Sequence, residues 1–208
     1  MISFVYFDVG GVVMEDFSGS GKWKIFMDEI HIPEAQQIDF TKFWDSYEQE
    51  FCRGKDVETI KPLIEKHFNV KFPDNYSILH DGIMSRFAEN RTIWPVVKEV
   101  QKTHKTGLLT NMYPGMLSAI HARKLLDDFI WDVTVDSSVV GFQKPDPEIY
   151  QIAEEKAGVK PEEIFFIDNS AKNIEGARKA GWQTFHYDAT NPEKASRDLM
   201  EEWKGLHK

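Results

Sequence analysis

The stretch FVYFDVGGVV, residues 4–13, decides the fold, because it sets an apolar run directly before one carboxylate and two glycines. An apolar run that ends in Asp8 is typical of a buried strand with a polar group at its carboxyl end. Gly10 and Gly11 follow at once, and residues without a side chain leave backbone N–H groups accessible to an anion. The stretch predicts a strand that ends in a ligand-binding turn.

Further short apolar runs recur in the second half of the chain and read as buried strands. They are TGLLTN at 106–111, IWDVTVDS at 130–137, EIFFIDNS at 163–170 and QTFHYD at 183–188. Helical patterns lie between them, at 114–126, 147–157 and 171–180. Strands that alternate with helices predict an α/β fold, in which a parallel five-stranded sheet is covered on both faces.

The segment from about residue 16 to residue 90 breaks this alternation and contains no strand-like run. Its amphipathic stretches lie at 22–30, 40–51, 57–68 and 76–87. They predict a helical insertion between the first strand and the rest of the sheet. Outside it, we interpret 123–129 as a helix with a charged face and 194–208 as an amphipathic helix that packs on the core.

Composition limits the classes of partner. The chain has 208 residues, 41% hydrophobic residues and a formal net charge of −9, and a field of that sign repels nucleic acid and anionic membranes. The single cysteine, Cys52, excludes an intrachain disulfide, and no apolar run approaches the roughly 20 residues needed to span a bilayer. We expect a cytoplasmic monomer or homodimer without nucleic-acid or membrane partners.

Polar residues end several of the predicted strands, and parallel sheets bind ligands at that edge. They are Asp8 with Gly10 and Gly11, Thr110 with Asn111, Lys144 in GFQKPDPEIY, and Asp168 with Asn169. Each alone is explained by helix capping or turn formation. Together they supply a carboxylate nucleophile, groups that hold an anion, and oxygens for a hard cation.

In this order and spacing, YFDVGGVV, LLTN, KPDPEIY and FFIDNSAKNIEGARKAG resemble the motifs of the haloacid dehalogenase (HAD)-like hydrolase superfamily. The resemblance covers nearly the whole chain and is greatest to subfamily I, whose members carry a helical cap. It implies a Rossmann-like three-layer catalytic core formed by residues 1–14 and 91–208. Residues 15–90 would form the cap domain.

The resemblance also implies roles for individual residues. Asp8 would be the nucleophile that accepts a phosphoryl group, assisted by Thr110 and Lys144. The phosphate-binding set would be Val9, Gly10, Gly11, Thr110, Asn111 and Lys144. Mg²⁺ would be held by Asp8, the Gly10 carbonyl, Asp168 and Asn169.

Two positions depart from the common pattern of the superfamily. Most of its phosphatases have a second Asp, a general acid and base, where this chain has Gly10. The first motif therefore resembles the Asp-x-Gly subgroup, which includes sugar-phosphate phosphatases. Many relatives also have an acid where this chain has Asn169, whose amide oxygen binds Mg²⁺ without contributing charge.

Three functions remain open. The first is a phosphatase acting on a small phosphorylated metabolite, with a sugar phosphate as the favoured substrate. The second is a 2-haloacid dehalogenase that uses Asp8 as nucleophile without a metal. The third is a catalytically weakened protein that binds a phosphorylated ligand, which Gly10 and Asn169 both favour.

The insertion offers further candidate site residues. Most of its aromatic side chains have helical spacing and are expected to pack in a core between helices. Trp44 and Tyr47 are candidates for contact with the organic part of a substrate. Glu15 and Asp16 lie where the chain enters the insertion, and we expect one of them to reach the leaving group.

Overall fold

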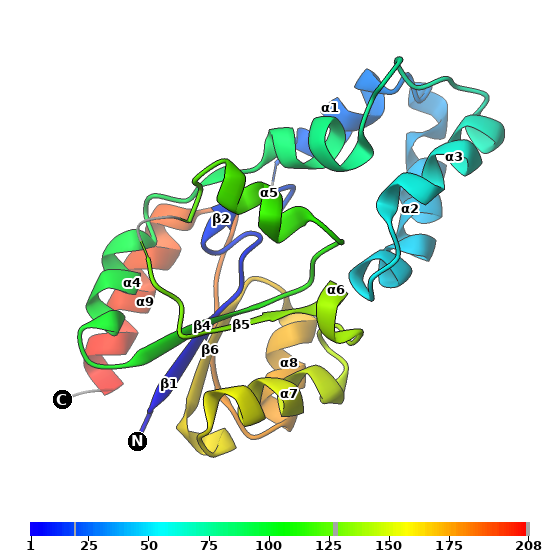
Figure 1. The fold of residues 1–208 in the computed structure, drawn as a ribbon. Coiled ribbons are helices and arrows are strands. Elements are labelled where there is room, and N and C mark those ends of the chain that lie inside the picture. Colours follow the sequence, from blue (N-terminus) through cyan, green and yellow to red (C-terminus); the bar gives the residue numbers. More distant parts are fainter. Residues whose placement is uncertain (19, 127–128, 207–208) are drawn as a thin grey trace.

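The computed structural model describes residues 1–18, 20–126 and 129–206, and it consists of an α/β core and a helical insert (Figure 1). The core sheet has five strands in the order β5-β4-β1-β6-β7. The strands are β1 (Phe4–Phe7), β4 (Lys105–Thr110), β5 (Val133–Asp136), β6 (Ile164–Asp168) and β7 (Gln183–His186). All neighbouring pairs are parallel, as the alternating sequence pattern predicts.

Strand β1 lies at the centre of the sheet, between β4 and β6. Its residue Phe7 is in register with Leu108 on one side and Ile167 on the other. All four residues of β1 are buried, because a central parallel strand is covered on both faces. This explains why the strand is an unbroken apolar run and not an alternating one.

Successive side chains of β1 enter two separate cores, one on each face of the sheet. Val5 and Phe7 pack in the core that α4 and α9 cover, and Phe4 and Tyr6 pack in the core that α7 and α8 cover (Figure 1). The core helices are α4 (Trp94–Gln101), α5 (Met116–Ala122), α6 (Ser137–Val140), α7 (Pro147–Ala157), α8 (Ala171–Lys179) and α9 (Pro192–Leu206), with a 3₁₀ turn at Pro161–Glu163. Because all five strands run parallel, their carboxyl ends lie at the same edge of the sheet.

The insert after β1 is helical, as predicted. Its α-helices are α1 (Lys22–Glu29), α2 (Gln37–Cys52) and α3 (Lys61–Phe68), with 3₁₀ turns at Glu34–Gln36 and Val57–Ile60. Phe26, Phe40 and Trp44 pack together in its interior, with ring centroids 5.8–6.2 Å apart. The expectation that most aromatic residues here build a core is confirmed for these three.

One predicted helical stretch differs in type, and another is wrong in the part that the structure describes. Residues 76–87 form a π-helical turn (Ile78–Ile83) and a 3₁₀ turn (Met84–Arg86) in place of an α-helix. Gly82, a poor helix former, lies so close to the Phe26 ring that a Cβ there would be 2.7 Å from it. In the run 123–129, residues 123–126 form turns, and Asp127 and Asp128 lie outside the described residues.

The chain passes between core and insert through a short two-stranded ribbon. Strand β2 (Met14–Glu15) pairs antiparallel with β3 (Ala88–Glu89), and the Asn90 side chain donates a hydrogen bond to the Val12 carbonyl at 2.7 Å. The ribbon lies near the predicted domain boundaries at residues 14 and 91, which stay a prediction. Within the described ranges, no helix is long and apolar enough to cross a membrane.

The far end of the insert also touches the core. An ion pair joins Arg53 to Asp146, with 2.9 Å between Nη2 and Oδ2. The Trp44 indole N–H donates to the Tyr113 hydroxyl at 3.3 Å. The insert contacts the core both at the ribbon and near α2. The space between the insert and the core is therefore bounded on opposite sides.

Candidate active site

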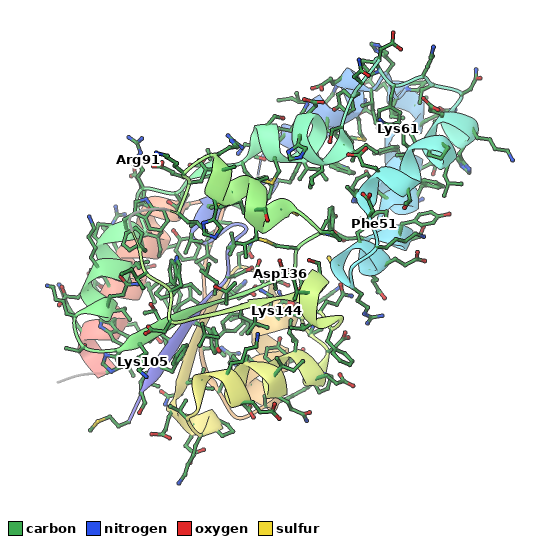
Figure 2. All side chains as sticks on the ribbon, viewed as in Figure 1. Phe51, Lys61, Arg91, Lys105, Asp136 and Lys144 are labelled. Atoms are coloured by element: carbon green, nitrogen blue, oxygen red, sulfur yellow. The ribbon has the colours of Figure 1, made fainter. Side chains whose placement is uncertain are left out.

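The carboxyl ends of three adjacent strands meet at one place. Asp8 directly follows β1, Thr110 is the last residue of β4, and Asp168 is the last residue of β6. All three are buried, and Lys144 reaches Asp8 and Asp168 from the loop between α6 and α7, where Figure 2 labels it. The structure therefore brings together four residues that lie far apart in the sequence.

The Lys144 ammonium group has three acceptors around it. Its Nζ lies 2.9 Å from Asp8 Oδ1 and donates to Asp168 Oδ2 at 2.7 Å. A third hydrogen bond goes to the Leu109 carbonyl at 2.9 Å. An ammonium has three N–H donors, so this one is fully satisfied although the side chain is buried. The two carboxylates outweigh the cost of burial and raise the pKa of Lys144, which stays charged.

Asp8 combines burial with an excess of negative charge. Burial and, to a smaller extent, the charge of Asp168 raise the pKa of Asp8 to about 7, although Lys144 lowers it. Its Oδ1 accepts the Val9 N–H at 2.7 Å, so that this amide, predicted to bind phosphate, is used by Asp8 in this state. Two carboxylates share one ammonium, and the site therefore favours an additional cation.

Asp168 is held in place by its neighbours. Its Oδ1 accepts the Ser170 N–H at 2.7 Å, and the Asn173 amide donates to both carboxylate oxygens, at 3.1 and 3.2 Å. With Lys144 on Oδ2, each oxygen already has partners. We infer that Asp168 orients Lys144 at least as much as it offers a metal ligand.

Asn111 holds the Lys144 main chain. Its Oδ1 accepts the Lys144 N–H at 2.8 Å, and its Nδ2 donates to the Lys144 carbonyl at 2.9 Å. This pair of bonds fixes the loop from which the ammonium projects. Contact between Asn111 and phosphate stays a prediction, since both ends of the amide are engaged here.

The two glycines after Asp8 have different structural reasons. Gly11 adopts a φ of +75°, and a Cβ there would lie 2.1 Å from the Asn169 amide nitrogen. Gly10 has no such backbone strain, because its φ is outside the left-handed range. A Cβ on Gly10 would instead lie 2.5 Å from Oδ2 of Asp16. The space that a side chain at position 10 would occupy is thus filled by the carboxylate of Asp16, which lies where the chain enters the insert.

Asp16 is fixed in that position by the turn that follows it. Its Oδ1 accepts the Ser18 N–H at 2.7 Å, and burial raises the pKa of Asp16. Ser18 also accepts a hydrogen bond from the Asn169 amide at 3.0 Å. Ser18 therefore links Asp16, at the entry to the insert, with Asn169, which directly follows β6.

The predicted magnesium ligands are oxygen donors of the kind that Mg²⁺ prefers. Two are carboxylates, on Asp8 and Asp168, one is the amide of Asn169, and one is the Gly10 carbonyl. Mg²⁺ is commonly held by one or two carboxylates together with substrate phosphate and water. No group of three His, Cys, Asp or Glu side chains in the described part of the chain could hold a metal. The residues present fit the donor chemistry of Mg²⁺, and the site itself stays a prediction.

A cleft of about 850 Å³ opens between this site and the insert. Asp16, Trp44 and Lys144 line it, and their contact with a substrate stays a prediction. Tyr47 is outside its lining and packs beside Phe43, with 5.1 Å between ring centroids. Glu15 lines a separate, smaller hollow, where its carboxylate lies 3.9 Å from Lys22 Nζ.

Sequence reasoning missed several residues that line this cleft. Thr41, Asp45, Glu48 and Cys52 face it from α2, and Tyr113 faces it from the core. The first four recur every three or four positions, which marks one face of a helix. That spacing was available in the sequence, but it does not say whether the face meets solvent, a core or a cleft.

Comparison with known proteins places this geometry in a family. The family model for haloacid dehalogenase-like hydrolases matches residues 5–181. An (S)-2-haloacid dehalogenase from Burkholderia cepacia is 32% identical over 111 residues, which are 51% of this chain and 47% of that protein. A phosphatase from Mycobacterium tuberculosis is 34% identical over 97 residues, or 45% of this chain and 44% of that protein. The matches thus span less than half of these two relatives.

Solved structures share the fold at low sequence identity. A HAD family enzyme from Bacteroides thetaiotaomicron has a TM-score of 0.76 and 19% identity, covering 100% of this chain and 98% of that one. The same enzyme with magnesium and inorganic phosphate has a TM-score of 0.73 and 20% identity, covering 91% and 96%. An L-2-haloacid dehalogenase from Xanthobacter autotrophicus, with chloropropionic acid covalently bound, has a TM-score of 0.64 and 20% identity, covering 90% and 78%.

Proposed function

Because this chain belongs to the haloacid dehalogenase-like hydrolases, we propose that it hydrolyses small phosphate monoesters through a phosphoryl group carried on Asp8. The observation that supports this most is the Asp16 carboxylate in the space beside Gly10. An alkoxide leaving group needs a proton, and a carboxyl group at this point can supply one. A halide leaves as a stable anion and has no such need.

The reaction takes place in two steps at phosphorus. A carboxylate oxygen of Asp8 attacks, the bond from phosphorus to the alcohol oxygen breaks, and that oxygen takes a proton from Asp16. Water then attacks the phosphoryl group, Asp16 recovers a proton from the water, and Asp8 leaves. Lys144 neutralises phosphoryl oxygens next to Asp8 throughout, and the Thr110 hydroxyl donates to them.

Magnesium is the proposed cofactor. Held by Asp8, the Gly10 carbonyl, Asn169 and Asp168, it would reduce the charge repulsion between the nucleophile and the incoming phosphate. The structural reason to expect this cation is that two carboxylates, on Asp8 and Asp168, face the single ammonium group of Lys144. The raised pKa of Asp8 is consistent with this excess of negative charge. A Bacteroides relative with this fold binds magnesium and phosphate.

The dehalogenase alternative shares the nucleophile but fits the cleft less well. A 2-haloacid carries a carboxylate, which needs a cation to bind. In the described part of the cleft lining the basic side chains are Lys144 and Lys172, both from the core, whereas the charged side chains that the insert contributes are all acidic. We favour a phosphate ester of a small alcohol because Asp16 can protonate its leaving group, with the sugar phosphates of the Asp-x-Gly subgroup as first choice.

Replacement of Asp16 by Asn tests the proton donor. We expect Asp16→Asn to lower kcat by about 10²- to 10⁴-fold for an alkyl phosphate, the usual contribution of general acid–base catalysis. The first step with p-nitrophenyl phosphate should fall much less, because that leaving group departs without a proton. The measurement is the burst and steady-state rate for both esters, with exposed Asp28→Asn as the control.

A swap of positions makes the same test more specific. Gly10→Asp alone places a side chain against Oδ2 of Asp16 and should lower activity. Gly10→Asp combined with Asp16→Ala returns one carboxylate to the same space. We expect kcat of this double variant to be at least about tenfold higher than that of Asp16→Ala alone. Equal rates for Asp16→Asn and wild type with alkyl phosphates would contradict the role of Asp16.

A further inference from the structure

The two walls of the active-site cleft differ in charge. The basic side chains in its lining, among the described residues, are Lys144 and Lys172, and both belong to the core. The insert wall carries Asp45 and Glu48 on α2, and no ion pair to either is found within the described ranges. The part of a substrate that points away from Asp8 therefore meets uncompensated negative charge.

Glu48 accepts a hydrogen bond from a buried residue of the core. The Tyr113 hydroxyl donates to Glu48 Oε1 at 3.1 Å, and it accepts the Trp44 indole N–H at 3.3 Å. Trp44 and Tyr113 are buried, so this relay fixes the carboxylate toward the core side of the cleft. A surface carboxylate that only served solubility would need no such support.

Two tryptophans line the same cleft as these carboxylates. Trp23 and Trp44 both line the cleft, with 5.3 Å between ring centroids. The Trp23 indole N–H donates to Thr41 at 2.9 Å, so neither tryptophan has its N–H left for a ligand. Trp44 is buried among other rings and Trp23 is half-buried, so Trp23 is the tryptophan of the pair with more surface in the cleft. Trp is the best aromatic partner for a cation.

We propose that the alcohol half of the substrate carries an ammonium group, bound by Glu48 and Asp45 in the part of the cleft that Trp23 and Trp44 also line. This inference rests on the proposed phosphatase function and names the substrate class of the same site. The phosphate of an amino-alcohol or amino-sugar ester lies at Asp8 and Lys144, and its ammonium group points toward α2. A second anionic group, as in phosphoglycolate, is repelled at that end.

Three esters of similar size test the proposal, because their far ends are positive, neutral and negative. We expect kcat/KM to decrease from phosphoethanolamine to glycerol phosphate to phosphoglycolate, with about tenfold or more between the first two. Glu48→Gln should reduce the preference for phosphoethanolamine over glycerol phosphate to less than about threefold. Asp39→Asn, on the same helix but outside the cleft lining and paired with Lys42 at 3.7 Å, should keep the wild-type ratio.

A binding measurement separates this inference from the proposed function. Choline, which has no phosphate, should quench tryptophan fluorescence saturably in wild type and at least about tenfold more weakly in Glu48→Gln. If p-nitrophenyl phosphate is not hydrolysed but choline binds in this way, the phosphatase fails and the ammonium site stands. If p-nitrophenyl phosphate is hydrolysed while glycerol phosphate equals or exceeds phosphoethanolamine, the ammonium site is overturned and the phosphatase stands. Absence of choline binding also overturns the ammonium site.

Discussion

Asp8→Asn should abolish phosphate release, with a fall in kcat of at least about 10⁴-fold, because an amide cannot form the covalent intermediate. Asn has nearly the same size and can still accept the Val9 N–H and face Lys144, so the fold should be kept. The measurement is phosphate release from sugar phosphates, nucleotides and p-nitrophenyl phosphate, with magnesium and with chelator. Exposed Asp198→Asn, paired with Lys194, is the control.

The pattern of results separates the three functions. Magnesium-dependent release that is lost in Asp8→Asn supports the phosphatase. Release that persists in Asp8→Asn contradicts Asp8 as nucleophile. No release from any ester, with halide release from 2-chloropropionate instead, would support the dehalogenase. If neither activity exists while phosphorylated ligands bind, the chain is a binding protein that has lost this chemistry.

Lys144→Met should lower the free energy of unfolding by roughly 3–5 kcal/mol, the usual cost of leaving buried charges without their partner. The variant leaves Asp8 and Asp168 adjacent without the ammonium that bridges them. It also leaves the Leu109 carbonyl without the hydrogen bond from Nζ. Urea unfolding of wild type and variant measures the difference.

An exposed ion pair provides the matched control for Lys144. Lys179 pairs with Glu175 at 2.7 Å, and both side chains are at least 67% exposed. Lys179→Met should change the free energy of unfolding by less than about 0.5 kcal/mol, as is usual for surface pairs. Equal effects of the two substitutions would mean that the Asp8–Lys144–Asp168 contact does not stabilise the fold.

The sheet and its ligand-binding edge could be predicted from the sequence because each strand is a short apolar run with a polar residue at its end. Asp8, Thr110 and Asp168 lie together as a consequence of parallel topology alone. The amphipathic spacing of residues 76–87 indicates a helix but not its type, whereas close packing of Gly82 on Phe26 is a tertiary effect. Local pattern carries no information on that contact.

The site could be predicted less completely than the fold. The sequence indicates that Gly10 replaces the Asp that serves as general acid and base in most related phosphatases, and it places Asp16 where the chain enters the insert. It did not show that the turn at Ser18 brings the Asp16 carboxylate back into the space beside Gly10. The cleft-lining face of α2 was equally hidden, since helical spacing identifies a face but not what lies opposite to it.

The most direct test of the central claim is the mass of the Asp8 peptide during turnover. Wild type should be mixed with excess p-nitrophenyl phosphate and magnesium, quenched in acid within one turnover, digested and examined by mass spectrometry. We expect the peptide containing Asp8 to gain one phosphoryl group in wild type and none in Asp8→Asn. An unmodified Asp8 peptide under rapid phosphate release, or a phosphoryl group on another residue, would contradict this expectation.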